Sequence, residues 1–323
     1  MPFTLTTDSA IDWLVGRGLA APGASLTAEE LPGGVSASVV AVRGPGVGIV
    51  VKQALARLRV ADEWLAKPER AETEADAMRL CGELTPGAVP RVLAVDSESH
   101  TLAIELVEGA ANWQAEVGEG RPHADVGAWA GEVLGRWHAA TASDPSVPER
   151  FGDFESFEQQ RLSPFHETVM ARRPELAPLI APYLAELRLP PRCLVHGDYA
   201  MKNILVGPAG RWVLDFEVAH AGNPVFDLAF FLSFPVLSAV RWPAVAGAMQ
   251  ELTAGFLAAY ARLVGEGFVG DDASVTGHTA CLVLARTDGK SPALFFDEPS
   301  RAGAREVGAH LLAHPDRGLW SWR

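Results

Sequence analysis

The stretch from residue 194 to residue 227 constrains the fold of this chain more than any other. Short apolar runs come directly before polar residues at two points, ahead of His196 and ahead of Asp215. Asp198 follows the first run, and Asn203 lies five positions after Asp198. Apolar runs of this length predict short buried strands. The stretch therefore predicts polar side chains at the ends of such strands, where a cleft can form.

The spacing of these polar residues matches the needs of phosphoryl transfer. That reaction uses one carboxylate to accept a hydroxyl proton, and an amide with a second carboxylate to hold Mg²⁺ on the phosphates. We therefore expect Asp198 to be the base. A hairpin through the turn at 208–210 brings Asn203 and Asp215 within reach of one Mg²⁺ ion. A set of solvated loop acids is the alternative interpretation.

Three further residues of this stretch are candidates for a role at the same site. Glu217 faces the same side as Asp215 if the chain stays extended, which makes Glu217 a third candidate metal ligand. Lys202 either contacts the transferring phosphate or faces solvent, and the sequence favours neither. Asp227 opens an apolar helix, where it can cap the helix or reach back to backbone amides of the 196–198 loop.

The composition of the whole chain excludes several classes of protein. With 323 residues, 48% of them hydrophobic, the chain is long enough for a large core or for two lobes that share a cleft. A net charge of −13, with no Lys or Arg cluster longer than a pair, argues against a nucleic-acid binder. The N-terminus lacks the features of a signal peptide, and the apolar window 225–240 is too interrupted to span a membrane. Widely spaced Cys81, Cys193 and Cys281 predict buried thiols, so we expect a cytoplasmic protein.

The first part of the chain predicts a small sheet that binds a nucleotide. Apolar runs at 35–42 and 49–51 flank a Gly-Pro-Gly turn and predict a β-hairpin. Gly33 and Gly34 precede this hairpin and are candidates for a phosphate-binding entry loop. Lys52 ends the second strand, where its ammonium group can neutralise nucleotide phosphates. An ordinary exposed lysine at the end of a strand is the alternative.

The segment 68–84 predicts a helix that carries the partner of this lysine. Glu74 lies on or beside the apolar stripe of the helix, whereas Glu72 points more toward solvent. A carboxylate on the inward side of a helix needs a partner. We therefore expect Glu74 to pair with Lys52, with Glu72 as the alternative.

A change from strands to helices marks the expected domain boundary. Strands are predicted at 90–96 and 101–107, and the Gly-, Glu- and Ala-rich segment after them is typical of a connection. Helices are then predicted at about 125–142, 154–170, 174–188, 224–238, 242–265, 272–287 and 300–313. We therefore expect an α+β protein with an N-lobe at 1–107, a linker at 108–124 and a helical C-lobe at 125–323.

Taken together, these motifs resemble the aminoglycoside phosphotransferase superfamily, which shares the bilobal protein-kinase-like fold. The matching pieces are Lys52 with Glu74, the strand end at 105–107, His196-Gly197-Asp198 with Asn203, Asp215-Phe216-Glu217, and Gly222-Asn223-Pro224 before Asp227. The resemblance implies that Lys52 binds nucleotide phosphates and that the backbone of Glu105, Leu106 and Val107 holds the adenine. It also implies that Asp198 is the catalytic base and that Mg²⁺ binds Asn203 and Asp215.

A narrower likeness is to methylthioribose kinases. The Lys-Gln-Ala-Leu run after the hairpin and the Asp-x-Glu form at 215–217 are similar to those kinases, and the second implies that Glu217 shares the metal. Asn203 stands where those kinases carry a different residue. The segment 285–296 is more similar to small generic members of the superfamily. Three charged residues of that segment either line the acceptor pocket or form a helix-end salt-bridge cluster: Arg286, Asp288 and Lys290.

The first hypothesis for the function is an ATP- or GTP-dependent kinase that phosphorylates a hydroxyl of a sugar, a sugar-like metabolite or an antibiotic. A second is a nucleotide-binding pseudokinase that serves as an interaction module, although every catalytic position is filled. A third is a kinase for protein side chains, but only nine residues lie between Glu217 and Asp227, too few for a peptide platform. The acceptor, the choice of nucleotide and the oligomeric state stay open at this level.

Overall fold

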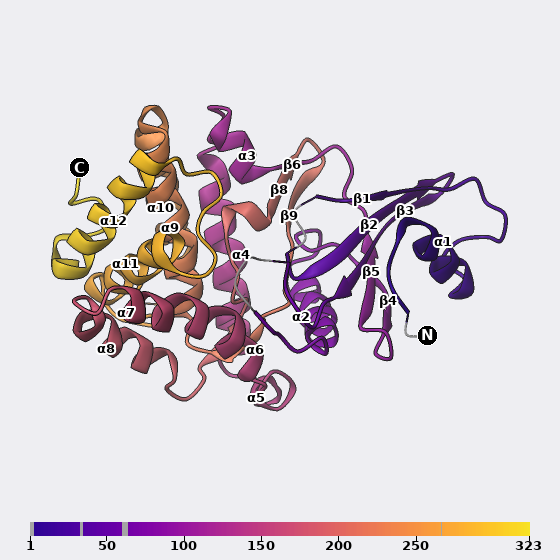
Figure 1. Cartoon of the computed structure of the whole chain (residues 1–323), viewed down its shortest axis with the longest axis horizontal. Coiled ribbons are helices and arrows are strands. Elements are labelled where there is room, and N and C mark those ends of the chain that lie inside the picture. The colour runs from indigo at the N-terminus through magenta and orange to yellow at the C-terminus, as the bar shows by residue number, and fades with distance from the viewer. Residues whose placement is uncertain (1–2, 33–34, 60–63, 266) are drawn as a thin grey trace. The chain divides into compact units, whose positions relative to one another are not determined.

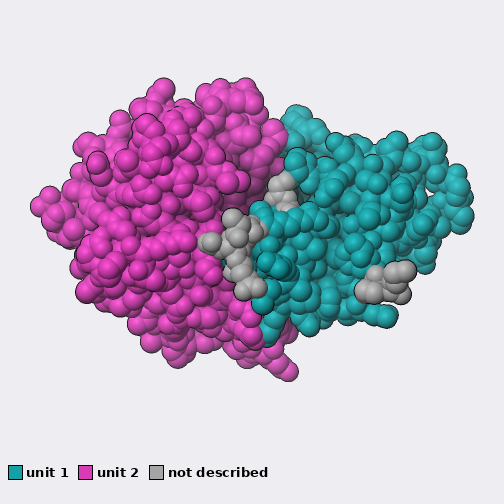
Figure 2. Space-filling view, in the orientation of Figure 1, with its two compact units in different colours: residues 1–110, 207–218 teal, residues 111–206, 219–323 magenta. Residues whose placement is uncertain are grey.

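The computed structural model describes residues 3–32, 35–59, 64–265 and 267–323 (Figure 1). The chain divides into two compact units, which Figure 2 draws in different colours. Unit 1 comprises Met1–Ala110 and Gly207–Val218, and unit 2 comprises Ala111–Val206 and Ala219–Arg323. Unit 1 is rich in sheet and unit 2 is mainly helical, which confirms the expected α+β class.

Unit 1 is built on a five-stranded antiparallel sheet with the strand order β1-β2-β3-β5-β4. Its strands are β1 (Thr27–Glu30), β2 (Ala37–Gly44), β3 (Val47–Ala54), β4 (Val92–Asp96) and β5 (Thr101–Glu105). The hairpin of β2 and β3 confirms the expectation from the two apolar runs. β1 was not expected, because its Thr-Ala-Glu-Glu sequence is largely exposed and has no apolar alternation.

The two faces of this sheet carry different helices, because successive residues of a strand point to opposite sides. On β3, Val51 is buried in a core with Val40, and this core includes residues of α1 (Thr7–Gly16). The next residue, Lys52, points to the other face, where its ammonium group meets α2 (Arg70–Leu84). A buried valine thus anchors the strand next to the lysine that it presents.

The segment 207–218 joins unit 1 although it is far from the rest of that unit in the sequence. It contains β9 (Gly210–Val213), and the backbone N–H of Val213 donates to the Ala88 carbonyl at 2.8 Å. Val213 is fully buried. This attachment fixes the strand end that carries Asp215.

Unit 2 is mainly helical. Its helices of five or more residues are α3 (Trp113–Gly118), α4 (Asp125–Thr141), α5 (Ser146–Arg150), the π-helix η1 (Glu158–Glu167), α7 (Thr168–Arg172), α8 (Ala177–Leu187), α9 (Val225–Arg241), α10 (Ala246–Val264), α11 (Asp272–Asp288) and α12 (Glu298–Ala313). Shorter turns are α6 (Glu155–Phe157), η2 (Met201–Asn203), η3 (Pro243–Val245) and η4 (Pro315–Arg317). Its short strands pair antiparallel, β7 (Cys193–Val195) with β10 (His220–Gly222) and β6 (Ala111–Asn112) with β8 (Ile204–Gly207).

Two glycines let α4 approach α10 closely. A Cβ added at Gly127 would lie 2.5 Å from the Leu252 carbonyl oxygen, and one at Gly131 would lie 2.1 Å from the Phe256 carbonyl oxygen. Larger side chains at these positions would push the two helices apart. This close contact fixes the position of α4, which carries His138 near its C-terminal end.

Helix α9 runs a few residues beyond the expected end at about residue 238. It continues to Arg241 and contains Pro235. The helix is buried along nearly its whole length. Packing on all sides stabilises the helix enough to offset the hydrogen bond that the proline removes. Within the described part of the chain, no helix combines the length and the apolar character that a membrane crossing needs.

The segment expected as a linker contains regular structure. β6 and α3 occupy residues 111–118, where we expected only a connection. Trp113 is fully buried there, and its ring centroid lies 6.0 Å from that of Phe231. One anchoring tryptophan among Gly, Glu and Ala residues gives too little periodicity to predict a helix.

His166 on η1 provides a test of how the core of unit 2 responds to acid. The side chain is buried, with neither ring nitrogen bonded to a described residue, and burial lowers the pKa of His166 to about 3, helped by nearby His278 and Arg188. Below pH 6.5 the unfolded chain binds a proton here that the folded protein does not, so the free energy of unfolding falls with falling pH. We expect His166→Phe to remove about 2 kcal/mol of the loss between pH 6.5 and about pH 5. Urea unfolding at both pH values measures this, with half-buried His314→Phe as the control, and equal slopes for wild type and His166→Phe would contradict it.

Candidate active site

Lys52 in unit 1 lies between two carboxylates. Its Nζ is 2.9 Å from Glu74 Oε1 and 2.5 Å from Asp215 Oδ1. The expected pair of Lys52 with Glu74 is therefore confirmed, and Glu72 instead lies 3.9 Å from the Nδ1 of His100. Asp215 reaches the same ammonium group because β9 belongs to unit 1.

The charges of this cluster shift the pKa values of its members. Burial lowers the pKa of Lys52, but the carboxylates of Asp215, Glu74 and Glu217 raise it, and the net pKa lies above the ordinary value for lysine. Burial raises the pKa of the Glu74 carboxyl to about 7, against the opposing effect of Lys52. The charge of Lys52 does not depend on whether Glu74 is protonated, because the Asp215 carboxylate by itself favours the protonated lysine. Lys52 is thus a cation at neutral pH, as phosphate binding requires.

Asp215 is held in an unfavourable backbone conformation. Its φ of 70° lies in the left-handed region, which non-glycine residues adopt rarely and at a cost of about 1–3 kcal/mol. Lys52 binds its side chain. Two residues later, Glu217 Oε2 accepts a hydrogen bond from Arg70 Nε at 3.1 Å, and Arg70 also donates to the Ser36 carbonyl. Contacts on both sides of Asp215 therefore fix the position of its carboxylate.

Sequence reasoning missed Arg70, the partner of Glu217. The Arg70 side chain is fully buried and that of Glu217 is 5% exposed. Glu217 was expected as a third metal ligand. With Oε2 bound to Arg70, that role would fall to its other oxygen, Oε1. The signal in the sequence was an arginine in the first turn of the predicted helix, a position where exposed arginines are also common.

The three residues expected to hold the adenine lie at the end of β5. The backbone N–H of Glu105 donates to the Arg91 carbonyl, and that of Leu106 donates to the Gly48 carbonyl at 3.0 Å. Both groups are thus committed within unit 1, and Val107 is the one of the three whose N–H has no backbone partner among the described residues. The Gly33 and Gly34 of the expected entry loop lie outside the described residues.

Asp227 anchors the loop that carries the expected base in unit 2. Its Oδ2 and Oδ1 accept hydrogen bonds from the backbone N–H groups of His196 and Gly197 at 2.7 and 2.8 Å. His138 Nε2 lies 3.2 Å from Oδ2, and Tyr260 bonds the other nitrogen of His138. Burial alone raises the pKa of Asp227, but these hydrogen bonds and the nearby histidines lower it below its ordinary value. Of the two roles considered for Asp227, binding the loop amides is confirmed.

The carboxylate of Asp198 lies at the centre of a ring of donors. Lys202 Nζ is 2.5 Å from Oδ2, and Asn203 Nδ2 donates to the same oxygen at 2.6 Å. Arg161 Nη2 lies 2.9 Å from Oδ1. Because the Asn203 amide uses its nitrogen for Asp198, its oxygen faces elsewhere and suits a hard cation such as Mg²⁺. The ion pair of Lys202 with Asp198 was not among the two alternatives for Lys202, and the lysine side chain remains 34% exposed.

Arg161 is the residue at this loop that the sequence did not indicate. It lies in η1, where we expected an ordinary helix across 154–170. Arg161 Nε also donates to the Gly197 carbonyl at 2.7 Å. A π-helix has hydrogen bonds to the fifth residue and often occurs at functional sites. Pro164 inside the helical pattern was the available signal that this segment is irregular.

The charged segment at the end of α11 divides into two parts. Asp288 binds Arg173 at 3.3 Å and Arg305 at 2.7 Å, which confirms the helix-end salt-bridge interpretation for this residue. Arg286 is 8% exposed and takes no part in that cluster. The backbone N–H of Lys290 donates to the Pro164 carbonyl of η1.

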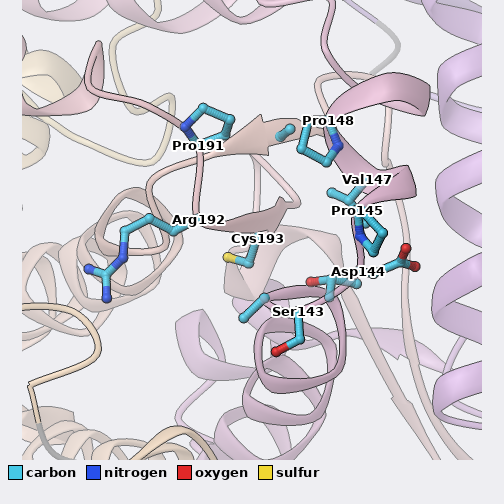
Figure 3. Close-up of a pocket in the computed structure, with 11 residues that line it drawn as sticks. Ser143, Asp144, Pro145, Val147, Pro148, Pro191, Arg192 and Cys193 are labelled. Carbon is cyan, nitrogen blue, oxygen red and sulfur yellow. The ribbon is translucent and has the colours of Figure 1, made fainter.

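A separate pocket of about 220 Å³ lies in unit 2 (Figure 3). Its lining comes from residues between 141 and 148, residues 191–193 and Ala221. Of the expected catalytic, nucleotide-binding and metal-binding residues that the structure describes, none lines it. The pocket is therefore not a candidate for the site of phosphoryl transfer.

Comparison with known proteins identifies the family of the chain. Residues 27–268, which make up most of the chain, match the model of a family described as the phosphotransferase enzyme family. One relative is the methylthioribose kinase of Bacillus velezensis, 26% identical over 266 residues, with 73% of this chain and 67% of that protein covered.

Solved structures of related kinases share the fold. A choline/ethanolamine kinase family protein from Mesorhizobium loti has a TM-score of 0.56 and 19% identity, with 96% of this chain and 95% of that chain covered. A spectinomycin phosphotransferase in complex with ADP and spectinomycin has a TM-score of 0.54 and 13% identity, with coverages of 98% and 100%. These likenesses confirm the kinase-like fold. The chain therefore belongs to the phosphotransferase enzyme family, as a small-molecule kinase.

Proposed function

We propose that this kinase transfers the γ-phosphate of ATP to a hydroxyl group of a sugar-like metabolite or an antibiotic, with Asp198 as the base. The observation that carries this proposal is the position of Asp198 in unit 2, on a loop anchored by Asp227 and surrounded by three donors. The three donors fix the orientation of the Asp198 carboxylate, as acceptance of a hydroxyl proton requires. Lys202 is proposed to stabilise negative charge on the transferring group as Asp198 takes the proton.

The nucleotide is proposed to bind unit 1. Lys52, oriented by Glu74, binds the phosphates, and the Glu105–Val107 backbone holds the adenine. The N–H of Val107 is the backbone donor proposed to bind the adenine ring. Gly33 and Gly34 complete the phosphate contacts. The proposed division is a nucleotide lobe at 1–107, a linker at 108–124 and an acceptor lobe at 125–323, from which the segment 207–218 is excepted because it belongs to unit 1. We propose ATP ahead of GTP.

The proposed metal is Mg²⁺, held by Asn203 and Asp215. Mg²⁺ in kinases is bound by a few protein oxygens together with phosphate oxygens and water. The amide oxygen of Asn203 and the second carboxylate oxygen of Asp215 fit this donor set, and Glu217 Oε1 is the third candidate. When bound, the ion offsets the charge that develops on the phosphates.

The acceptor is proposed within the range that the relatives' names span, from methylthioribose to amino alcohols and spectinomycin. The 26% identity favours methylthioribose kinase activity as a specific candidate. A nucleotide-consumption screen tests this with methylthioribose, other sugars, aminoglycosides and nucleoside antibiotics. Acceptor-dependent ADP release is the expected result, and its absence across all four classes would count against the proposal. All three cysteines are buried and outside any disulfide, which supports a cytoplasmic location, where thiols stay reduced.

Lys52→Met tests the nucleotide side of this proposal. We expect Mg·ATP to bind about tenfold more weakly or worse, which corresponds to about 1.4 kcal/mol, because the cation between Glu74 and Asp215 is lost. Calorimetric titration of Mg·ATP measures the change. Arg79→Met, which removes an exposed cation of α2 that pairs with Asp76, is the matched control. Equal affinity in wild type and Lys52→Met would rule out the lysine as a phosphate ligand.

A further inference from the structure

Two buried arginines of unit 2 lie beside the loop that carries the base. Arg161 of η1 is 7% exposed and Arg286 of α11 is 8% exposed. Arg161 is fully engaged, since it donates to the Gly197 carbonyl at 2.7 Å and lies 2.9 Å from Asp198 Oδ1. A buried guanidinium needs such partners, because an unpaired charge is costly to take out of water.

Arg286 lacks partners of this kind. Its Nη1 donates to the Ser291 carbonyl at 2.7 Å, but its Nε has no hydrogen-bond partner among the described residues. The nearest acid along its own helix, Asp288, is bound to Arg173 and Arg305 instead. Burial lowers the pKa of Arg286 to about 10, Asp198 raises it and Arg161 lowers it. Arg286 is thus still a cation at neutral pH.

Two phenylalanines of α9 each contact one of the two guanidinium groups. Phe230 and Phe234 lie one turn apart on α9, and their ring centroids are 5.6 Å apart. The guanidinium carbon of Arg161 lies 5.8 Å from the Phe230 centroid. That of Arg286 lies 5.8 Å from the Phe234 centroid. Arg161 and Arg286 therefore both pack on aromatic rings of α9. Arg161 pairs with Asp198, and Asp198 also acts electrostatically on Arg286.

The charge around Asp198 is unbalanced as a result. Arg161, Lys202 and Arg286 supply three positive charges against two carboxylates, that of Asp198 and that of Asp227, which binds the loop amides. This excess stands out in a chain with a net charge of −13. A cationic acceptor would be repelled from such a surrounding, whereas an anionic group would supply the partner that Arg286 lacks.

We propose that the acceptor of this kinase carries an anionic group, a carboxylate or a phosphate, and that Arg286 binds it beside Asp198. The proposal rests on the phosphoryl-transfer function proposed above and narrows its acceptor to an anionic sugar-like metabolite or antibiotic, which ranks neutral methylthioribose and the cationic acceptors behind it. Arg286 is the specificity-determining residue, and Arg161 holds Asp198 in place behind it. The same anion chemistry could come from the transferring phosphoryl group of the nucleotide, so the experiment separates these two sources.

Calorimetric titration of inorganic phosphate into the full-length protein tests the site without turnover. One series uses protein saturated with Mg²⁺ and AMP-PNP, whose terminal phosphate fills the position of the transferring group, and a second uses Mg²⁺ and ADP. We expect phosphate to bind in both series. In Arg286→Met we expect binding to weaken by about tenfold or more. Tetramethylammonium, a matched cation, is expected not to bind.

The controls keep the result independent of folding and of the catalytic assignment. Arg136→Met removes an exposed arginine that pairs with Glu132 and is expected to leave phosphate binding unchanged. Arg286→Lys keeps the charge, so it tests the site if the methionine variant unfolds, and it is expected to bind phosphate more weakly than wild type but more tightly than Arg286→Met. Equal binding in wild type and both Arg286 variants overturns the proposal. So does binding with ADP that disappears with AMP-PNP, since Arg286 would then serve the nucleotide. Failure of the base assignment would appear in turnover and leave these titrations unaffected.

Discussion

Asp198→Asn is expected to lower kcat by about 10³-fold, within the range of about 10²–10⁴ that general-base catalysis contributes. The amide keeps the shape of the side chain but cannot accept the proton of the acceptor hydroxyl. Nucleotide affinity is expected to stay nearly unchanged, because Lys52 and the 105–107 backbone belong to unit 1. The assay is ADP release with the acceptor that the screen identifies, together with a separate titration of Mg·ATP.

Glu251→Gln is the matched control for this change. Glu251 is an exposed carboxylate of α10 in the same unit, so its conversion to an amide should leave kcat unchanged. Near-normal turnover in Asp198→Asn would rule out Asp198 as the base. A loss of nucleotide affinity as large as the loss of kcat would also contradict it, because the defect would then not be confined to proton transfer.

The second large effect is expected from Asp227→Ala, which should destabilise the protein by about 3–5 kcal/mol. The substitution leaves the backbone N–H groups of His196 and Gly197 and the ring of His138 without their common acceptor. Each buried polar group left unpaired costs about 1–3 kcal/mol. Urea unfolding followed by tryptophan fluorescence measures the loss, because Trp137 stacks on His196 with ring centroids 6.3 Å apart.

Asp271→Ala separates this role from ordinary helix capping. Asp271 is the N-cap of α11 and accepts a hydrogen bond from the Ser274 N–H at 2.8 Å. Removing such a cap costs about 1 kcal/mol. If Asp227→Ala lowered the free energy of unfolding no more than Asp271→Ala does, Asp227 would contribute only as an acidic residue in the first turn of α9. If it also left kcat intact, the anchoring of the 196–198 loop would have no catalytic consequence.

The 196–203 loop could be predicted from the sequence because its signals are local. Asp198 and Asp215 follow apolar runs and Asn203 precedes one, and short strands at 193–195, 204–207 and 210–213 bear out these runs. Lys52 and Glu74 could also be matched, since a carboxylate on an apolar helix face needs a partner and few cations precede it in the chain. The pairing is confirmed at 2.9 Å.

The residues that could not be predicted depend on contacts between distant segments. Arg70 reaches Glu217 across 147 positions, and Arg161 reaches Gly197 across 36. Nothing in the local pattern distinguishes these arginines from exposed ones, because only the packing of the finished unit buries them. Strand β1 was not predicted for a related reason. Its pairing with β2 satisfies backbone groups, and its side chains stay largely exposed.

The π-helical form of η1 has a consequence for the comparison of sequences in this family. Each π-helical hydrogen bond spans one residue more than an α-helical one, so the segment 158–167 accommodates an extra residue relative to an α-helix. Deleting one residue there would restore α geometry and turn the side chains on its two sides by about 100° relative to each other. A one-residue gap in an alignment at this segment would then mean that a side chain other than Arg161 meets Asp198. Such a gap would change the surroundings of the proposed base, although it lies more than thirty positions from Asp198 in the sequence.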